Sequence, residues 1–599
     1  MNSISTVIFQ SAKLGDKRFI LEELESATEL LKEKNSIQRV FGISGGALVA
    51  LAFSLQLSAQ REPARWGRAI KALNEFHDFL SKARSHQIRA FNLNPTFGRS
   101  NLHPLKRWLQ KKLAQYIGKP EIKFAELPVR LYFGTLQTNS EFTLFGPTDD
   151  SMQMDYQFVH IGPPEDTDII NACIAALSTP LSTIPVLVNE KWCFDCRPAI
   201  ADAGAIIADL LKADPDTIYR TIPYTPIRSW KLNFITSSFI MHSQHERNQA
   251  LLAEEYLSQL KDARTNTRRT QSKRSKNRAR VFHIQLPYVG STEAATNMRE
   301  SVANRAELIK KFSKLLEGQI DPINFSQPSN LIYGAGGFSG ILAGLTATRV
   351  IDDKFKKGGG EILQIYGVSA GLINGFFHAV EVAAHRHPEI YTPAAVNALK
   401  DLDDLIARMT PATFLKMNKN PFKLWKGWAN LDPFENFLCE KLRAYTGIDD
   451  PERITFDDVK LPLTVTAARG DGFTEFIGMT QPERRMEFAG REIKVISSPI
   501  VSAMIAGWSM NTYVVPKKLN GQQYRDGGGT FYDPGYFVAK LDQKPVNLIN
   551  IHLDDPEGHY YALPERMNLF QLLLDTHNMT FPEERRRMFY LTNLFFNNL

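Results

Sequence analysis

Short apolar runs recur along the chain, and each leads through a tight turn into apolar positions at helical spacing. Residues 362–366 form one such run, and apolar side chains follow it through 372–377. Residues 40–41 form another, followed by an apolar pattern through 47–53. Strands that alternate with helices and end in glycine-containing turns predict an α/β fold.

A serine stands at the turn in both places. The first turn reads Gly42-Ile43-Ser44-Gly45-Gly46 and the second reads Gly367-Val368-Ser369-Ala370-Gly371. The flanking glycines permit a strand, a sharp turn and a helix without clashes of Cβ atoms. Each serine hydroxyl is then predicted at a helix N-terminus, where backbone N–H groups stabilise negative charge.

Two further glycine-rich segments flank the second serine along the chain. Upstream, the apolar run at Leu331 enters the segment Gly334–Gly340, and downstream lies Asp526 followed by three glycines. A glycine loop, then a serine elbow, then Asp-Gly-Gly is the order found in the patatin-like phospholipases, and this chain resembles that family. The resemblance implies Ser369 as the nucleophile and Asp526 as its base, without a catalytic histidine.

The same resemblance implies the rest of the site and its chemistry. Backbone amides of Gly336 and Gly337, joined by those of Phe338 and Ala370, would form the oxyanion hole. The expected reaction is hydrolysis of a fatty-acyl ester of a lipid through an acyl-serine, with no cofactor and no metal. Two alternatives stay open: an acyltransferase or thioesterase that uses the same dyad, and a pseudoenzyme that binds a lipid or a protein.

The chain contains the same plan twice. Asn101-Leu102-His103-Pro104-Leu105 parallels Asn430-Leu431-Asp432-Pro433-Phe434, and the segment that ends in Asp195 parallels the one that ends in Asp526. The separation from serine to aspartate is 151 residues in the first copy and 157 in the second. The resemblance therefore implies two three-layer domains, each with a mostly parallel central sheet flanked by helices.

The expected organisation follows from this duplication and from the length of 599 residues, which exceeds one ordinary core. Residues 1–318 are predicted to form the first domain, and 331–599 the second, catalytic one. Residues 319–330, which contain Pro322 and Pro328, are predicted to be a linker.

The first copy is expected to be degenerate, although it keeps Ser44 and Asp195. Its first strand enters Gln10-Ser11-Ala12-Lys13 rather than a glycine cluster, and Cys196 and Arg197 follow the aspartate. Side chains at these positions keep backbone donors away from an oxyanion, and losing one such donor costs about 100- to 1000-fold in rate.

The second copy also departs from the family pattern. Ser339 stands where the family's glycine loop has a basic residue, which leaves head-group preference and rate open. His552 and His559 follow Asp526, so a Ser–Asp–His triad is an alternative to the dyad in chain order.

Charge adds one local feature to this interpretation. The formal charge is +7, but residues 264–280 hold eight Lys or Arg and no acid, so the remainder of the chain carries −1. A flexible, solvated loop and a contact with anionic lipid heads are the two interpretations of this stretch. It lacks interleaved aromatic residues, so we expect no nucleic-acid partner.

Four cysteines are too few and too uneven for a disulfide framework, which is consistent with a reducing compartment. We also expect no signal peptide and no membrane span. These observations predict a cytoplasmic protein, with peripheral membrane contact as the second interpretation of its basic stretch. The sequence does not indicate an oligomeric state.

Overall fold

The computed structural model describes two compact units, one within residues 4–221 and one within residues 281–554. The described ranges are 4–10, 14, 17–33, 35–91, 100–137, 142–147, 159–161, 167–179, 183–196, 207, 210–211, 217–221, 281–287, 314, 316, 318–334, 337–408, 411–418, 429–470, 474–481, 484–488, 491–509, 514–529, 534–542 and 547–554.

The first unit is built on a mixed sheet with the order β10-β1-β2-β5-β6-β7, in which β8 and β9 form an antiparallel pair beside β5. The neighbours β10, β1, β2 and β5 are all parallel. Its strands are β1 (Thr6–Phe9), β2 (Arg39–Ile43), β5 (Arg130–Gln137), β6 (Phe142–Phe145), β7 (Val159–Ile161), β8 (Val186–Val188), β9 (Lys191–Asp195) and β10 (Ile218–Arg220). Its helices are α1 (Lys17–Leu30), α2 (Gly46–Arg61), α3 (Pro63–Trp66), α4 (Ala72–Lys82), α5 (Ser85–Ile88), α6 (His103–Ile117) and α7 (Ile169–Leu177). A two-residue pair, β3 (Ala90–Phe91) and β4 (Ser100–Asn101), lies outside the sheet.

The second unit has a larger sheet with the order β11-β22-β12-β13-β16-β17-β19-β18, parallel from β11 to β16. Its strands are β11 (Val281–Pro287), β12 (Ser329–Tyr333), β13 (Ile362–Val368), β16 (Leu463–Arg469), β17 (Thr474–Gly478), β18 (Arg485–Phe488), β19 (Arg491–Ile496), β20 (Lys517–Leu519), β21 (Gln522–Asp526) and β22 (Asn547–Asp554). Its helices are α12 (Gly337–Gly358), α13 (Gly371–Arg386), α14 (Ala398–Arg408), α15 (Pro411–Phe414), α17 (Asp432–Thr446), α18 (Ile500–Gly507) and α19 (Gly535–Asp542), with a small pair β14 (Lys416–Met417) and β15 (Ala429–Asn430).

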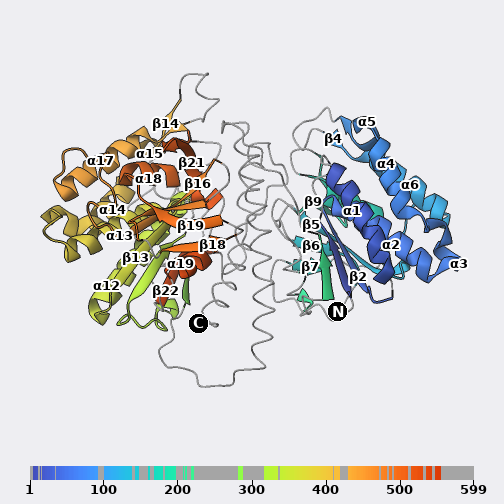
Figure 1. Ribbon diagram of the computed structural model, residues 1–599, viewed down its shortest axis with the longest axis horizontal. Coiled ribbons are helices and arrows are strands. Elements are labelled where there is room, and N and C mark those ends of the chain that lie inside the picture. The colour runs from blue at the N-terminus through green and yellow to red at the C-terminus, as the bar shows by residue number, and fades with distance from the viewer. Residues whose placement is uncertain are drawn as a thin grey trace. The chain divides into compact units, whose positions relative to one another are not determined.

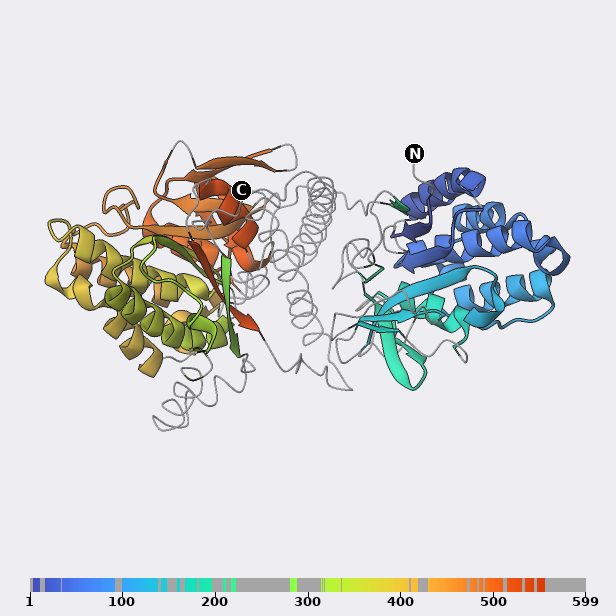
Figure 2. The ribbon, with the colours of Figure 1, turned by 90° about the horizontal axis from the view of Figure 1, so that it is seen from below.

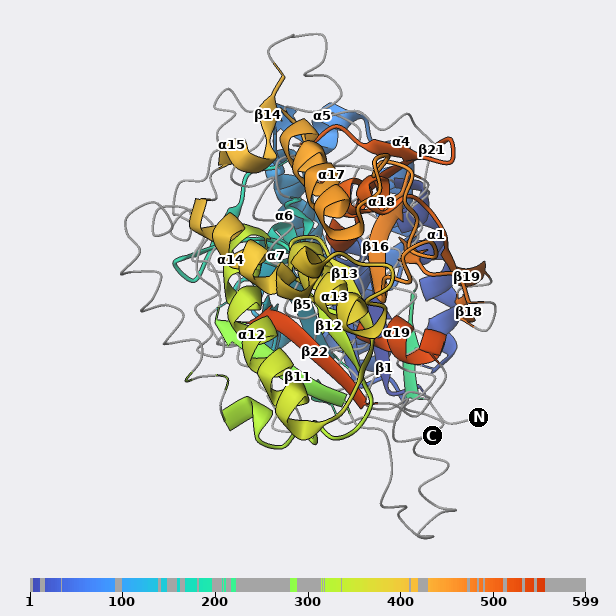
Figure 3. The ribbon, with the colours of Figure 1, turned by 90° about the vertical axis from the view of Figure 1, so that its left-hand side faces the viewer.

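Helices cover the sheet in each unit. Helix α2, drawn in blue, packs on β2 in the first unit (Figures 1 and 2). In the second unit α12 and α13 lie over β12, β13 and β22 (Figure 3), and α19 lies on the other side of the sheet (Figure 1). The predicted α/β class is therefore confirmed. No helix in these described ranges is both long and apolar enough to cross a membrane.

The duplication inferred from the sequence is visible in matching elements. Helices α2 and α13 both begin two residues after the turn serine, and both contain 16 residues. Helices α6 and α17 both contain 15 residues and end at a left-handed glycine, Gly118 or Gly447. A buried tyrosine of each helix donates to an acid of the preceding long helix, Tyr116 to Glu75 and Tyr445 to Asp401.

The boundary between the units differs from the predicted one. Strand β11 was expected within a first domain of residues 1–318, but all seven of its residues pair with β22 of the second sheet. An apolar strand needs a neighbour for its backbone groups, and its sequence does not say which sheet supplies one. The boundary therefore lies between Thr221 and Val281. The basic stretch 264–280 falls outside the described residues.

The predicted linker is also part of the second unit. Ile320, Ile323 and Phe325 are at most 8% exposed and belong to its core, and Phe325 packs edge-to-face on Phe355. Prolines in this segment indicate a break in secondary structure. Such a break is compatible with a packed connection as well as with a free linker.

The glycine that begins α13 offers a test of this fold. A Cβ atom on Gly371 would lie 2.2 Å from the carbonyl oxygen of Tyr333, which belongs to rigid backbone. We expect Gly371→Ala to destabilise the second unit by about 1–3 kcal/mol, measured by calorimetry of the full chain. Gly318→Ala, where a Cβ meets nothing within 4 Å, is the control and should be neutral or slightly stabilising. Equal stability of the two variants would contradict this packing.

Candidate active site

Ser369 occupies a sharp turn between the central strand β13 and helix α13. Its backbone is left-handed, with φ of 51°, which is unusual for any residue other than glycine. The neighbouring glycines are required by close contacts: a Cβ on Gly367 would lie 2.8 Å from the Cα of Leu372. The sequence pattern of this turn is therefore explained by strain and packing, which hold the hydroxyl at the end of the strand.

Asp526 reaches the same point from a distant part of the chain. It ends β21, whose backbone pairs with Ala467 of β16, the strand next to β13. The hydroxyl of Ser369 donates to its Oδ2 at 2.6 Å, across 157 residues of sequence. The amide of Gly528 donates to its Oδ1 at 2.8 Å, so both carboxylate oxygens are oriented. The predicted proximity of this serine and this aspartate is thus found.

The electrostatics of the pair follow from its burial. Ser369 and Asp526 are 7% and 6% exposed. Burial raises the pKa of Asp526 from its ordinary 3.8 to about 6, although the hydrogen bonds from Ser369 and Gly528 oppose the rise. At neutral pH the carboxylate is therefore ionised and more basic than an exposed one, which suits it to accept a proton.

The expected oxyanion donors are placed in part. Ala370 is the N-cap residue of α13 and Gly337 is the first residue of α12, so both lie where helix amides have no acceptor within their own helix. The amide of Gly334 donates to the carbonyl of Ile551, which makes it part of the sheet. Gly336 and the side chain of Phe338 lie outside the described residues.

The first unit contains a second serine–aspartate pair with similar geometry. Ser44 has φ of 52°, and its hydroxyl donates to Oδ2 of Asp195 at 2.7 Å. The two residues are 1% and 0% exposed, and Thr179 Oγ1 lies 3.5 Å from the same oxygen. The serine–aspartate hydrogen bond is therefore formed in the first unit as well, although we expect this copy to be degenerate.

The surroundings of this second pair differ from those of the first. Gln10 follows β1 at the place where Gly334 follows β12. The backbone N–H of this buried residue donates to the carboxylate of Glu23 and to the hydroxyl of Thr221. Its side chain donates to the carbonyl of Thr221 as well. The absence of glycines here is evident from the sequence, but no local pattern indicates this polar cluster. Only the tertiary structure brings residue 221 next to residue 10.

The remaining candidates from the sequence are His552, His559 and the four cysteines. The Ser369 hydroxyl contacts Asp526 directly, with no imidazole between them, and His552 lies on β22; His559 is outside the described residues. None of the four cysteines, all of which lie in the described ranges, forms a disulfide bond, and three of them are buried. Across the described ranges, no group of three or more His, Cys, Asp or Glu is arranged to hold a metal ion.

Comparison with models of known protein families finds no match, and comparison with curated proteins finds no significantly similar sequence. The interpretation of this site therefore depends on its own geometry.

The raised pKa of Asp526 predicts a pH-dependent cost to stability. Below about pH 4 the carboxyl group is protonated in the folded and in the unfolded chain, so it does not change the free energy of unfolding. Between about pH 4 and pH 6 it ionises more readily in the unfolded chain, and the free energy of unfolding falls. We expect the full chain to lose up to about 2–3 kcal/mol relative to Asp526→Asn over this interval, measured by thermal unfolding against pH.

Asp458 supplies a control of opposite sign. Hydrogen bonds from the amide and hydroxyl of Thr455 hold the pKa of Asp458 below its ordinary value. Its ionised form therefore stabilises the fold above about pH 4, and Asp458→Asn should be the less stable protein at neutral pH, with the difference lost in acid. The same pH trend in both variants would contradict the assignment for Asp526.

Proposed function

We propose that the second unit is a serine acyl-hydrolase of the patatin-like type, which cleaves fatty-acyl esters of lipids with Ser369 and Asp526. The observation that carries the proposal is the direct hydrogen bond of 2.6 Å from a serine on a strained strand–helix turn to a buried carboxylate. A serine hydroxyl is a weak nucleophile until a base removes its proton, and this contact supplies the base.

The chemistry follows from the contacts. Asp526 accepts the Ser369 proton as the serine oxygen bonds to the acyl carbon, and the former carbonyl oxygen takes the negative charge. Amides at the start of α13 and α12, including those of Ala370 and Gly337, are the proposed donors to this oxyanion. The carboxyl group returns the proton to the leaving alcohol. Asp526 then takes a proton from water as the water oxygen bonds to the acyl carbon. The bond from that carbon to Ser369 Oγ breaks, the carboxylic acid leaves, and Asp526 returns the proton to Oγ.

An ester of a long acyl chain is the proposed substrate class, on the strength of the motif order of patatin-like phospholipases. Acyl transfer is the same chemistry with an alcohol other than water as the acceptor, so the dyad also serves that alternative. One observation favours the third alternative, a binding pseudoenzyme: the two dyad residues are both nearly fully buried. The reactivity of Ser369 separates this alternative from the other two.

The first unit is proposed to be catalytically silent. Its dyad is formed, but Gln10 and its partners fill the place at which the glycine loop starts in the second unit. Cys196 takes the place of Gly527, where a Cβ would lie 2.4 Å from the carbonyl oxygen of Thr466. A site without the donors of the glycine segment loses about 100- to 1000-fold in rate for each missing donor.

The two dyads provide matched variants for the test. We expect the full chain and Ser44→Ala to release p-nitrophenol from acyl esters and to react with a fluorophosphonate probe at Ser369. Ser369→Ala should lose at least about 1000-fold in turnover and all labelling at that site. Product analysis with added alcohols then distinguishes hydrolysis from acyl transfer.

A folded chain that is not labelled at Ser369 would refute the enzyme and favour the binder. Labelling at Ser44 would overturn the assignment of the first unit as silent.

The pH profile offers an independent test of the base. Asp526 must be ionised to accept a proton, so kcat/KM should rise with pH through an apparent pKa of about 6 and then level off. Asp526→Asn should retain at most about 1% of the activity. Activity that stays constant between pH 4 and pH 8 would exclude Asp526 as the base.

A further inference from the structure

A buried polar network lies beside the candidate site in the second unit, and the proposed mechanism does not use it. The hydroxyl of Tyr333 and Nδ1 of His378 share a hydrogen bond of 2.8 Å. On the other side of the imidazole, Nε2 lies 3.7 Å from Oδ1 of Asp352, an ion-pair distance. Tyr333 and His378 are 1% and 0% exposed.

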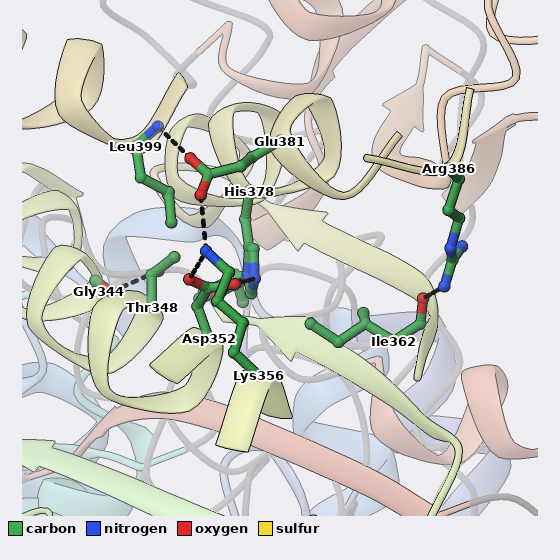
Figure 4. Close-up of polar contacts among 10 residues, drawn as sticks. Gly344, Thr348, Asp352, Lys356, Ile362, His378, Glu381, Arg386 and Leu399 are labelled. Atoms are coloured by element: carbon green, nitrogen blue, oxygen red, sulfur yellow. Dashed lines mark hydrogen bonds and ion pairs between the residues drawn. The ribbon is translucent and has the colours of Figure 1, made fainter. Parts of the chain in front are cut away.

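The network continues outward through charged groups (Figure 4). Lys356 lies between two carboxylates, with its Nζ 2.6 Å from Asp352 and 3.0 Å from Glu381. The second oxygen of Glu381 accepts from the amide of Leu399 at the start of α14. Burial raises the pKa of Asp352, but contacts with His378 and Lys356 outweigh it and hold that pKa below its ordinary value. The carboxylate therefore stays charged beside the imidazole at neutral pH.

The network connects the elements that carry the proposed chemistry. Tyr333 ends β12 and directly precedes the glycine-rich segment, Asp352 lies on α12, and His378 lies on α13. Helix α12 begins at Gly337, a proposed oxyanion donor, and α13 begins two residues after Ser369. A link among these three elements therefore governs the distance between the donors and the nucleophile.

Tyr333 is held on its main chain as well as on its hydroxyl. The Cβ position of Gly371 lies 2.2 Å from its carbonyl oxygen, so the first turn of α13 packs directly on the end of β12. Helices α12 and α13 also approach closely where a Cβ on Gly344 would lie 2.1 Å from Nδ2 of Asn374. A Cβ on Gly371 would also lie 2.6 Å from the carbonyl oxygen of Gly334, so the start of the glycine segment packs directly against the turn that carries Ser369.

The first unit shows that packing alone does not require polar side chains here. Phe9 pairs with Gly42 as Tyr333 pairs with Gly367, and Phe53 follows Ser44 by the same nine residues as His378 follows Ser369. The two aromatic pairs even share an edge-to-face arrangement, with interplanar angles of 64° and 66°. The unit without a glycine segment therefore fills this place with two phenylalanines.

Buried polar pairs of this kind rarely add stability over apolar side chains of similar shape, because their desolvation offsets their attraction. What they add is a fixed geometry. We propose that Tyr333, His378 and Asp352 form a polar clamp that positions Gly334, at the end of β12, and the N-terminus of α12 against Ser369. The clamp rests on the proposed function, and its members are positioning residues because none of them contacts the dyad.

The first unit also suggests the variants that test the clamp. Tyr333→Phe and His378→Phe each break the hydrogen bond, and the double variant reproduces the pair of phenylalanines in the first unit. We expect each variant to fold and to lose about 10- to 100-fold in kcat for ester hydrolysis, with KM changed less than about threefold, because the donors shift relative to the nucleophile. His378→Asn, which keeps an amide near the position of Nδ1, should recover most of the loss.

A second measurement reports on the link without depending on activity. Hydrogen exchange in the peptide 334–345 should become faster in Tyr333→Phe and in His378→Phe than in the unmodified chain. Phe53→Leu changes the same place on the helix after the other serine turn. It should lower the stability of the first unit and leave both kcat and exchange in 334–345 unchanged.

The outcomes separate the clamp from the proposed function. A folded double variant with unaltered kcat and unaltered exchange would overturn the clamp. The clamp would also be overturned if the losses in kcat matched the losses in stability across the variants and His378→Asn did not recover kcat. If the unmodified chain hydrolyses no ester but exchange in 334–345 still rises in the variants, the proposed hydrolase is wrong. The link between β12, α12 and α13 then stands as a property of the fold.

Discussion

The contact between Ser369 and Asp526 depends on how closely three backbone segments can approach one another. The turn after β13 packs on the end of β12, and β21 packs on β16 so tightly that a Cβ at Gly527 would lie 2.4 Å from a carbonyl oxygen. Glycine is the residue that fits such places, and a serine in a left-handed conformation is held there by its surroundings. The contact between the hydroxyl and the carboxylate is thus a consequence of close packing between parallel and antiparallel strands of one mixed sheet.

If the first unit is silent, as we propose, a serine–aspartate contact is not sufficient to define an active site. Both units hold the hydroxyl within 2.7 Å of a buried carboxylate oxygen. In the first unit the same contact satisfies Asp195, whose burial would otherwise be costly, so it can serve the fold alone. What differs is the chain around it, where Gln10 and Cys196 stand in place of glycines.

The sequence predicted the features that depend on neighbouring residues. Strand-turn-helix patterns located β2 with α2 and β13 with α13. The family resemblance implied the pairing of Ser369 with Asp526, and the repeat extended it to Ser44 and Asp195. It did not predict that β11 joins the second sheet, because a strand's own residues do not name its neighbour. It also missed Tyr333 and His378 as partners, since a histidine on a buried helix face carries no local signal of what lies across from it.

The two units also differ in what fills equivalent places in their cores. Phe41 and Tyr132 are register partners with stacked rings in the first sheet, whereas the corresponding partners in the second are Tyr366 and Thr464. There the tyrosine hydroxyl donates to Asp542, which pairs with the buried Arg484. Apolar contacts tolerate small shifts, but hydrogen-bonded charges lose their compensation when they move, so such networks fix a geometry at some cost in stability. Tyr366 lies on β13, the strand that leads to Ser369, so this network holds the strand that carries the proposed nucleophile. A site with the proposed donors, nucleophile and base must hold them within a few tenths of an ångström.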